Sequence, residues 1–548
     1  MRLLIVGGVA GGMSAATRAR RLDDAAEIII FEKGPHVSFA NCGLPYFIGG
    51  TIRERDSLLV QTPEGLRKRF RLDVRVRSEV TSIDRTRKEL SVLDLSDGRT
   101  CTERYDKLIL APGADPIRPP IPGVRDPAVH CLRNIDDMDR IAAAVEAERS
   151  GAAIVIGGGF IGLEMAENLV RRGWHVALAE MLPQVMPALD PEMAEPIHQH
   201  LRDKGIELHL SNAAVAVERE GKRLVVRLQD GTALKGSFAI LGVGLRPNTR
   251  LAEEAGLEIG PSGGIKVDGH LRTSDPDIYA VGDAVEVTDY VTGRPTLLPL
   301  AGPANRQGRI AANNVCGRES TFRGVQGTAI VRIFDLAAAN TGANEKTLRK
   351  LGIAHQKVYV HPFSHADYYP GASQMSLKLL FSTEDGRVLG AQVVGTEGVD
   401  KRVDVLATAV QARMTVYDLE EAELVYAPQF STAKDAINMA GFVAANYLRG
   451  DVDIVHVDQL GGDTVVLDVR TAGEYLKGHI PGALNIPVDD LRQRLDEVPR
   501  GKLMAVYCGV GLRSYIACRI LKQKGFKVAN VPGGYKTYQH YKPPRQGK

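Results

Sequence analysis

Residues 152–180 read AAIVIGGGFIGLEMAENLVRRGWHVALAE, an apolar run, a glycine turn and a helix-like segment before a second apolar run. Gly157, Gly159 and Gly162 have G-x-G-x-x-G spacing, which allows a tight turn and close approach of the backbone to a pyrophosphate at a positive helix N-terminus. Glu180 ends the second run, where a carboxylate accepts hydrogen bonds from ribose hydroxyls and repels a 2′-phosphate. The stretch therefore predicts a dinucleotide site that favours NADH, with NADPH still possible.

A less regular copy of this unit begins at the N-terminus. Residues 1–22 read MRLLIVGGVAGGMSAATRARRL, with Gly7 and Gly12 at the first and third glycine positions and Val9 at the second. The apolar run that follows ends at Glu32, the counterpart of the ribose-binding acid. Two such units predict two Rossmann-like dinucleotide-binding domains in an α/β protein.

Composition narrows the class of protein. A chain of 548 residues should hold about three or four domains. Its 69 basic and 66 acidic residues give a net charge of +3, which argues against nucleic-acid binding. Six cysteines without close pairs, and no apolar signal segment, favour a reducing cytoplasm. No run reaches the roughly 18–20 apolar residues of a membrane span, and no cysteine or histidine spacing predicts a metal site.

One cysteine stands in an unusual context. Residues 38–50 read SFANCGLPYFIGG and place Cys42 between an asparagine and a glycine. Phe47 occupies the position at which a two-cysteine disulfide reductase would carry its second sulfur. We therefore expect Cys42 to react as a single thiol.

Two later segments complete an ordered set of motifs. YDKLILAPGADP at residues 105–116 and TSDPDIYAVGDAVE at residues 273–286 resemble segments of flavoprotein pyridine nucleotide-disulfide oxidoreductases. With the two glycine turns, this resemblance covers about residues 1–450. It implies FAD at the first nucleotide site, NADH at the second, and Asp283 on the ribityl chain of the flavin.

The segment SFANCGLPY closely resembles the active-site segment of coenzyme A disulfide reductases. That resemblance implies a mixed disulfide between Cys42 and a thiol substrate. The peroxidase branch of the superfamily carries a histidine where this chain has Ala10, which disfavours a peroxidase. The family positions that contact coenzyme A correspond to Ser14, Arg18, Arg21, Ser38, Asn41 and Lys434.

SHADYYPGA at residues 364–372 and VYAPQFSTAKDAINMAG at residues 425–441 resemble the dimerisation region of the same family. The resemblance implies a homodimer in which one tyrosine from each segment reaches the partner's cysteine. These tyrosines are Tyr368, with Tyr369 as the alternative, and Tyr426. A phenol can donate a hydrogen bond to a departing thiolate without adding charge.

A separate domain is expected after this region. Residues 465–487 read VVLDVRTAGEYLKGHIPGALNIP, and residues 508–514 read CGVGLRS. Together they resemble a rhodanese domain that spans about residues 452–541. The resemblance implies that Cys508 carries a sulfane sulfur as a persulfide.

The residues around Cys508 suit that chemistry. Gly509 and Gly511 let backbone amides turn toward an anionic sulfur, and the following helix adds its positive N-terminal end. Arg513 closes the loop and is placed to attract an anionic donor. Scaffold roles are expected for Asp468, Arg470, Glu474 and His479.

These observations predict an α/β protein with two Rossmann-like dinucleotide-binding domains, an α+β dimerisation domain and a C-terminal α/β rhodanese domain. The expected boundaries are 1–112 and 246–322 for the FAD-binding domain, 113–245 for the NADH-binding domain, 323–450 for dimerisation and 452–548 for the rhodanese domain. The predicted activity is FAD-dependent reduction of persulfide or polysulfide by NADH, with coenzyme A as thiol or persulfide. Coenzyme A disulfide reduction for thiol homeostasis is the alternative, followed by an NADH oxidase or peroxidase and a non-redox sulfur relay.

Overall fold

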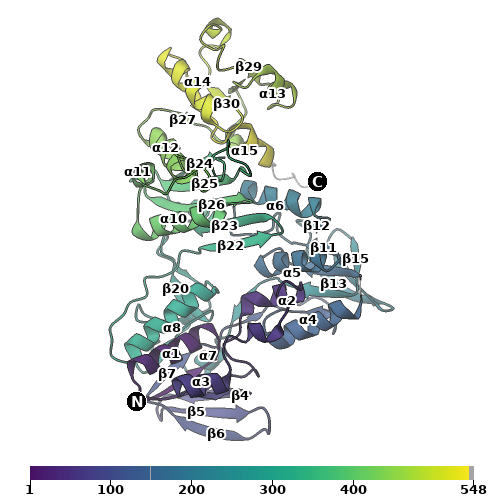
Figure 1. Cartoon of the computed structure of the whole chain (residues 1–548), viewed down its shortest axis with the longest axis vertical. Coiled ribbons are helices and arrows are strands. Elements are labelled where there is room, and N and C mark those ends of the chain that lie inside the picture. Colours follow the sequence, from purple (N-terminus) through teal and green to yellow (C-terminus); the bar gives the residue numbers. More distant parts are fainter. Residues whose placement is uncertain (149, 542–548) are drawn as a thin grey trace. The chain divides into compact units, whose positions relative to one another are not determined.

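The computed structural model describes residues 1–148 and 150–541, which form two compact units (Figure 1). The first unit contains Met1–Pro183 and Gly205–Val325, and the second contains Gln184–Lys204 and the described part of 326–548. Residues 184–204 thus lie in the second unit, although they fall within the range expected for the NADH-binding domain. No helix of the described residues is long and apolar enough to cross a membrane.

The first unit contains a parallel five-stranded sheet near the N-terminus. Its strand order is β19-β7-β1-β2-β3. The strands are β1 (Arg2–Val6), β2 (Glu27–Phe31), β3 (Asp73–Arg75), β7 (Lys107–Leu110) and β19 (Ile278–Ala280). Helix α1 (Ala10–Leu22) packs tightly on α8 (Ala301–Val315), since a Cβ at Gly308 would lie 2.2 Å from the carbonyl oxygen of Gly11.

A second parallel sheet in this unit has the order β12-β11-β10-β16-β9. Its strands are β9 (Val129–His130), β10 (Ala152–Ile156), β11 (His175–Ala179), β12 (Glu207–His209) and β16 (Phe238–Leu241). The helices beside it are α4 (Ile135–Ala147) and α5 (Phe160–Arg171), and α5 follows the regular glycine turn. In both sheets a buried apolar strand leads into a glycine turn and a helix, as the sequence predicts.

Smaller elements complete the first unit. Three antiparallel groups are β4 (Ser78–Asp84) with β5 (Glu89–Asp94) and β6 (Thr100–Arg104), β13 (Ala214–Glu220) with β14 (Arg223–Leu228) and β15 (Ala233–Gly236), and β8 (Ala114–Pro116) with β17 (Leu245–Pro247). A mixed sheet contains β18 (Ile265–Lys266), β20 (Val285–Thr288) and β21 (Pro295–Thr296). The remaining helices are α2 (Leu44–Ile48), α3 (Pro63–Phe70) and α7 (Arg250–Glu254).

The second unit begins with an antiparallel sheet of order β22-β23-β26-β25-β24. Its strands are β22 (Ala329–Ile333), β23 (Leu336–Gly342), β24 (His355–Val360), β25 (Ser376–Ser382) and β26 (Val388–Gly395). The helices are α6 (Pro191–Asp203), α9 (Glu345–Leu351), α10 (Val399–Ala412), α11 (Val416–Glu421) and α12 (Ala436–Leu448).

A buried ion cluster attaches α6 to this sheet. The ammonium of Lys378 is fully buried and lies 2.9 Å from Asp190, 2.5 Å from Glu192 and 2.6 Å from Glu345. Burial alone raises the pKa of Glu345, but Lys378 and Lys357 bring that pKa down to about 2. The three carboxylates are close enough to hold a cation, and the lysine ammonium takes that place.

The C-terminal part of the second unit is a parallel sheet of order β27-β31-β30-β28-β29. Its strands are β27 (Asp453–Ile454), β28 (Val465–Asp468), β29 (Leu484–Asn485), β30 (Met504–Tyr507) and β31 (Val528–Asn530), and its helices are α13 (Ala472–Leu476), α14 (Leu512–Gln523) and α15 (Gly534–His540). Helix α15 contacts the antiparallel sheet, because Nε2 of His361 lies 2.9 Å from the Thr537 hydroxyl and Lys536 donates to Gln374 at 2.6 Å.

Candidate active site

The two glycine turns of the first unit have the same steric design. Gly7 and Gly157 have φ of +99° and +106°, where a side chain would be strained. A Cβ on Gly12 would lie 1.9 Å from the carbonyl oxygen of Gly7, and one on Gly162 would lie 1.9 Å from that of Gly157. A Cβ on Gly159 would meet no protein atom within 4 Å, so open space at that position fits a ligand that approaches the backbone.

The acids that follow β2 and β11, Glu32 and Glu180, each accept a hydrogen bond from the glycine turn of the same nucleotide-binding unit. Glu32 accepts from the backbone N–H of Gly8 at 2.8 Å, and Glu180 accepts from the N–H of Gly158 at 2.7 Å. Each carboxylate is therefore fixed beside the turn at which a ribose would lie. This donor and acceptor set fits a dinucleotide at both sites.

Cys42 lies in a short 3-10 turn, Asn41–Gly43, directly before α2. Its side chain is exposed in the single chain. Surrounding protein partly desolvates the thiol, and the carboxylates of Glu164 and Asp283 add to this effect, so the pKa of Cys42 is raised. These neighbours place Asp283 and Cys42 in one electrostatic site and do not favour the thiolate.

A contact beside Cys42 joins the two nucleotide-binding parts of the first unit. The Tyr46 hydroxyl, on α2, donates to Oε1 of Glu164, on α5, at 3.0 Å. Burial raises the pKa of both groups. The Glu164 carboxylate further raises the pKa of Tyr46 and that of Cys42. The sequence analysis did not identify this pair. The one available signal was the position of Glu164, two residues after Gly162 of the glycine motif.

Three of the predicted coenzyme A residues, Ser14, Arg18 and Arg21, lie on α1, and Asn41 lies beside Cys42, where its side chain donates to the carbonyl of Arg133 at 3.2 Å. Ser14 donates to Asn305 of α8 at 2.5 Å, and Arg18 donates to Asn313 of α8 at 2.8 Å. The backbone N–H of Ser38 donates to the carbonyl of the first glycine turn at 2.8 Å. The turn, α1 and the segment that leads to Cys42 are thus one connected structure.

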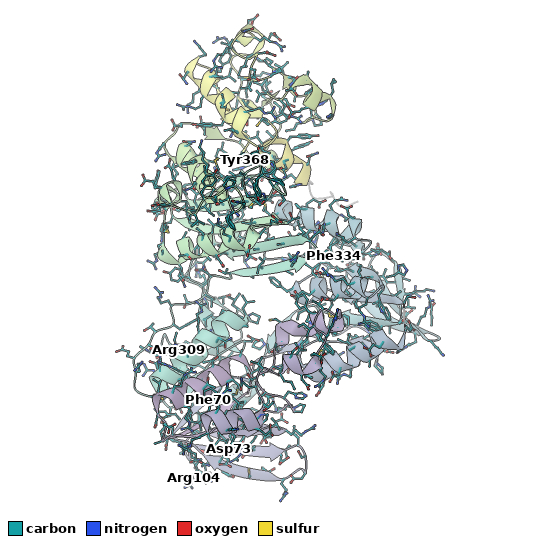
Figure 2. All side chains as sticks on the ribbon, in the orientation of Figure 1. Phe70, Asp73, Arg104, Arg309, Phe334 and Tyr368 are labelled. Atoms are coloured by element: carbon teal, nitrogen blue, oxygen red, sulfur yellow. The ribbon has the colours of Figure 1, made fainter. Side chains whose placement is uncertain are left out.

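The predicted residues Arg18 and Arg21 belong to a cluster of four arginines. Its members are Arg18, Arg21, Arg309 and Arg318. Partial desolvation, followed by the charges of the other three arginines, lowers the pKa of Arg18. Arg309 lies on α8 and is labelled in Figure 2. Arg309 and Arg318 were missed from sequence because they lie far along the chain from α1. Four cations in one place suit a ligand with phosphate groups.

In the second unit the two predicted tyrosines meet. The hydroxyls of Tyr368 and Tyr426 lie 3.2 Å apart, and the side chains are 72% and 50% exposed. Tyr368 is labelled in Figure 2. The hydrogen bond from Tyr426 raises the pKa of Tyr368. Phe430 and Lys434 are also exposed, so aromatic and cationic groups share the surface of these segments.

A buried ion pair ties the two tyrosine segments together. Arg402, which is 1% exposed, donates to the Asp435 carboxylate at 2.7 Å and to the carbonyl of Ser364 at 2.9 Å. The hydroxyl of Ser431 donates to the same carboxylate. Sequence reasoning missed Arg402, although an arginine on the buried face of an apolar helix is a signal for such a pair.

Cys508 lies at the end of β30 and is 1% exposed. Its sulfur accepts from the backbone N–H of Gly511 at 3.1 Å and from the Ser514 hydroxyl at 3.5 Å. Gly511 has φ of +106°, which lets its N–H turn inward. The N–H of Tyr535 donates to the Cys508 carbonyl at 2.7 Å and fixes the other side of the loop. One domain thus supplies the whole cradle for an anionic sulfur.

Arg513 is paired within the same domain. Its guanidinium donates to both oxygens of Glu474, at 2.8 and 2.7 Å. Glu474 also accepts from the backbone N–H of Thr471 at 3.1 Å. The hydrogen bonds from Arg513 lower the pKa of Glu474 to about 2, because their effect is larger than the opposing effect of partial burial.

The fold and these sites define a class. The sequence matches the pyridine nucleotide-disulphide oxidoreductase family over residues 1–308, the dimerisation domain of that family over residues 328–437 and the rhodanese-like domain over residues 455–541. The chain belongs to the pyridine nucleotide-disulphide oxidoreductase family and carries a rhodanese-like domain. Membership implies the use of a flavin and a pyridine nucleotide. The predicted fold class is confirmed.

Individual relatives show which members of the family this chain is similar to. A crystal structure of reduced Bacillus anthracis CoADR-RHD has a TM-score of 0.96 and 48% identity and covers 98% of both chains. An NAD-dependent persulfide reductase from A. fulgidus has a TM-score of 0.92 and 39% identity over 98% of this chain and 100% of its own. A coenzyme A disulfide reductase from Staphylococcus aureus is 36% identical over 444 residues, which are 81% of this chain and 99% of that protein. The resemblance predicted from sequence is confirmed.

Proposed function

We propose that this enzyme reduces persulfides and polysulfides with NADH, and that coenzyme A serves as the carrier thiol. The observation that carries the proposal is the pairing of a lone redox cysteine, Cys42, with a cradled rhodanese cysteine, Cys508, in one chain. All six cysteines are free, and Phe47 leaves Cys42 without a neighbouring thiol. The name of the A. fulgidus relative, which matches across both halves, supports persulfide as substrate.

Each nucleotide site has a proposed occupant. The first site holds FAD and the second holds NADH, and together these groups supply an electron pair to the cysteine. FAD is held by Gly7, Gly12, Glu32 and Asp283, and NADH by Gly157, Gly159, Gly162 and Glu180. The fixed carboxylate of Glu180 repels a 2′-phosphate, which supports NADH over NADPH.

Cys42 then breaks the sulfur–sulfur bond of the substrate. The thiolate attacks a coenzyme A persulfide at one of its two sulfurs. Attack at the carbon-bound sulfur expels hydrosulfide with the electron pair and leaves a mixed disulfide of Cys42 and coenzyme A. Attack at the terminal sulfur expels the coenzyme A thiolate and leaves a Cys42 persulfide. Either product is returned to the Cys42 thiolate by two electrons from NADH.

The basic surface on α1 supports coenzyme A as the carrier. Its phosphates suit the arginine cluster of α1 and α8, and its thiol arm then extends toward the segment of Cys42. The proposed contacts are Ser14, Arg18, Arg21, Ser38, Asn41 and, from the second unit, Lys434. A phosphate partner would offset the repulsion that Arg309, Arg318 and Arg21 exert on Arg18.

A homodimer completes the site. Partial desolvation and the carboxylates of Glu164 and Asp283 raise the pKa of Cys42, so hydrogen-bond donors from a partner subunit would favour its thiolate. Tyr368 and Tyr426 are exposed phenols that can donate such hydrogen bonds, and the dimerisation domain supports their delivery to a partner subunit. Six free cysteines support a cytoplasmic enzyme.

Coenzyme A disulfide reduction is the second candidate, because the Staphylococcus aureus relative carries that name. In that case Cys508 would serve an accessory role. Ala10 replaces the histidine of the peroxidase branch, which disfavours a peroxidase.

One experiment separates these functions. NADH consumption is measured anaerobically with coenzyme A persulfide and with coenzyme A disulfide at matched concentrations, in the wild type and in Cys42→Ser. Faster Cys42-dependent turnover of the persulfide, with one sulfide released per NADH, supports the proposal. Faster turnover of the disulfide would assign the enzyme to the thiol pool. Cys42-dependent NADH consumption that needs oxygen or peroxide instead would assign it to the oxidases.

A further inference from the structure

The Cys508 loop contains a single charged residue, and that charge is already compensated. Among residues 508–514 only Arg513 carries a charge. Both of its terminal nitrogens donate to Glu474, which is fixed in turn by the N–H of Thr471. With Cys508 as thiolate, the three groups carry one net negative charge. A donor with two negative charges therefore meets repulsion at the loop.

The positive features of the loop act on the sulfur itself. The N–H of Gly511 and the hydroxyl of Ser514 both donate to the Cys508 sulfur, at 3.1 and 3.5 Å. Helix α14 begins directly after this turn, so its positive end faces the same atom. These donors stabilise a thiolate or persulfide on Cys508.

Exposed apolar side chains lie in the loop and on the helices next to it. Val510 is 37% exposed, Leu512 57% and Ile516 42%. Leu512 and Ile516 are four residues apart on α14 and share one face. Leu476, which is 83% exposed, ends α13, the helix that contains Glu474. An extended uncharged arm would cover these side chains, whereas a small hydrated dianion would not.

We propose that the Cys508 loop takes sulfane sulfur from persulfides on a neutral, extended arm, and that Glu474 excludes dianionic donors. This inference rests on the proposed function and names the substrate class of the rhodanese site. The Cys508 thiolate attacks the terminal sulfur of the donor R–S–S–H. The bond between the two donor sulfurs breaks, R–S⁻ leaves with the electron pair, and Cys508 holds the –S–S–H group. The step needs neither NADH nor flavin, since the sulfane sulfur is transferred without net oxidation.

The test uses the full chain with Cys42→Ser, so that Cys508 is the sulfur acceptor under study. Without NADH, the protein is mixed with N-acetylcysteamine persulfide, whose arm is neutral, with mercaptosuccinate persulfide, whose arm carries two carboxylates, or with thiosulfate. Mass spectrometry of the Cys508 peptide gives each loading rate. We expect the neutral donor to load at least about tenfold faster than either dianion at low salt, with a smaller ratio at high salt. Equal rates, or faster loading by a dianion, would overturn the inference.

A second comparison isolates Glu474. Glu474→Gln keeps the side-chain shape and removes the charge, so loading by both dianions should rise about fivefold while the neutral donor changes less than about twofold. Glu497→Gln is the matched control, because Glu497 also pairs with an arginine, Arg494, in the same domain. An equal effect of Glu474→Gln on all donors would contradict a charge filter. If that variant does not fold, the donor and salt comparison in the parent chain still decides.

Failure of this inference is distinguishable from failure of the proposed function. The loading assay contains no NADH and no Cys42 thiol. An enzyme that reduces only coenzyme A disulfide can still show the charge preference at Cys508. A persulfide reductase whose rhodanese loop loads readily from thiosulfate would refute the inference alone.

Discussion

Cys42 and Cys508 show two ways to prepare a sulfur for reaction. Cys508 is buried, and its own domain supplies every donor that the structure places on its sulfur. Cys42 is exposed, and the charged neighbours that act on it, Glu164 and Asp283, are acidic. The first sulfur is stabilised by local backbone geometry, whereas the second needs groups from outside its own segment. The cradle of Cys508 is thus complete within one small domain, whereas we propose that cofactors and a partner subunit complete the site of Cys42.

The largest effect should separate the two cysteines. We expect Cys42→Ser to lower NADH-dependent turnover of coenzyme A persulfide by at least about 10³-fold, because the nucleophile is lost. Cys508→Ser should lower turnover of polysulfide far more than turnover of coenzyme A persulfide. Anaerobic NADH oxidation checks both, with the exposed Cys101 changed to Ser as the control. Equal losses with both substrates in both variants would break the division of labour between the sulfurs.

The partner subunit's contribution is tested by mixing variants. Tyr426→Phe removes the hydrogen-bond donor and should lower turnover by about 10²-fold. Dimers assembled from Cys42→Ser and Tyr426→Phe chains contain one site with both an intact cysteine and an intact tyrosine. Those mixed dimers should recover activity that neither parent shows. Absence of recovery, with mixed dimers present by native mass spectrometry, would place the tyrosine in the same chain as its cysteine.

A pH dependence should come from the ion cluster around Lys378. The pKa of Glu345 is lowered to about 2, below its ordinary value of 4.5, so its pairing stabilises the fold fully above pH 4.5. That stability is lost as the pH falls toward 2, where the folded protein takes up a proton. We expect the free energy of unfolding of the second unit to fall by about 2 kcal/mol over this interval. Urea unfolding at several pH values measures it, and Glu345→Gln should flatten the slope. An unchanged slope in that variant would assign the dependence to other acids.

The smallest effect concerns the cradle of Cys508. Ser514→Ala removes one of the two hydrogen-bond donors to the Cys508 sulfur, so persulfide loading at neutral pH should fall severalfold, by about 1 kcal/mol. Mass spectrometry of the Cys508 peptide measures the loading rate. Thr464→Ala, at the edge of the same domain, is a control. An unchanged loading rate would mean that the backbone amide of Gly511 stabilises the sulfur without the hydroxyl.

The sequence was most informative where local geometry makes the site. The glycines of both turns predicted their own steric role, and CGVGLRS predicted the cradle of Cys508, because turn and sulfur are neighbours in the chain. The fold class followed from the same periodic patterns. By contrast, Arg309, Glu164 and Arg402 contribute through helix packing, which brings together residues far apart in sequence.

Charge compensation was also invisible from sequence. Arg513 was expected to attract an anion, but the structure pairs it with Glu474, which is 39 residues away. Residues 184–204 likewise follow a nucleotide-binding motif in sequence yet lie in the second unit, since α6 carries Glu192 to the buried ammonium of Lys378. Motifs predict the groups that a site contains, and packing decides which of their charges remain available.

The most direct test identifies the thiol that forms a disulfide with Cys42. Wild-type enzyme is treated with coenzyme A disulfide and then quenched with acid and an alkylating reagent, with and without prior NADH, and the Cys42 peptide is analysed by mass. We expect a mixed disulfide with coenzyme A on Cys42 that disappears when NADH is added. A Cys42 peptide that never carries coenzyme A, and that instead forms a sulfenic acid with peroxide during turnover, would contradict it.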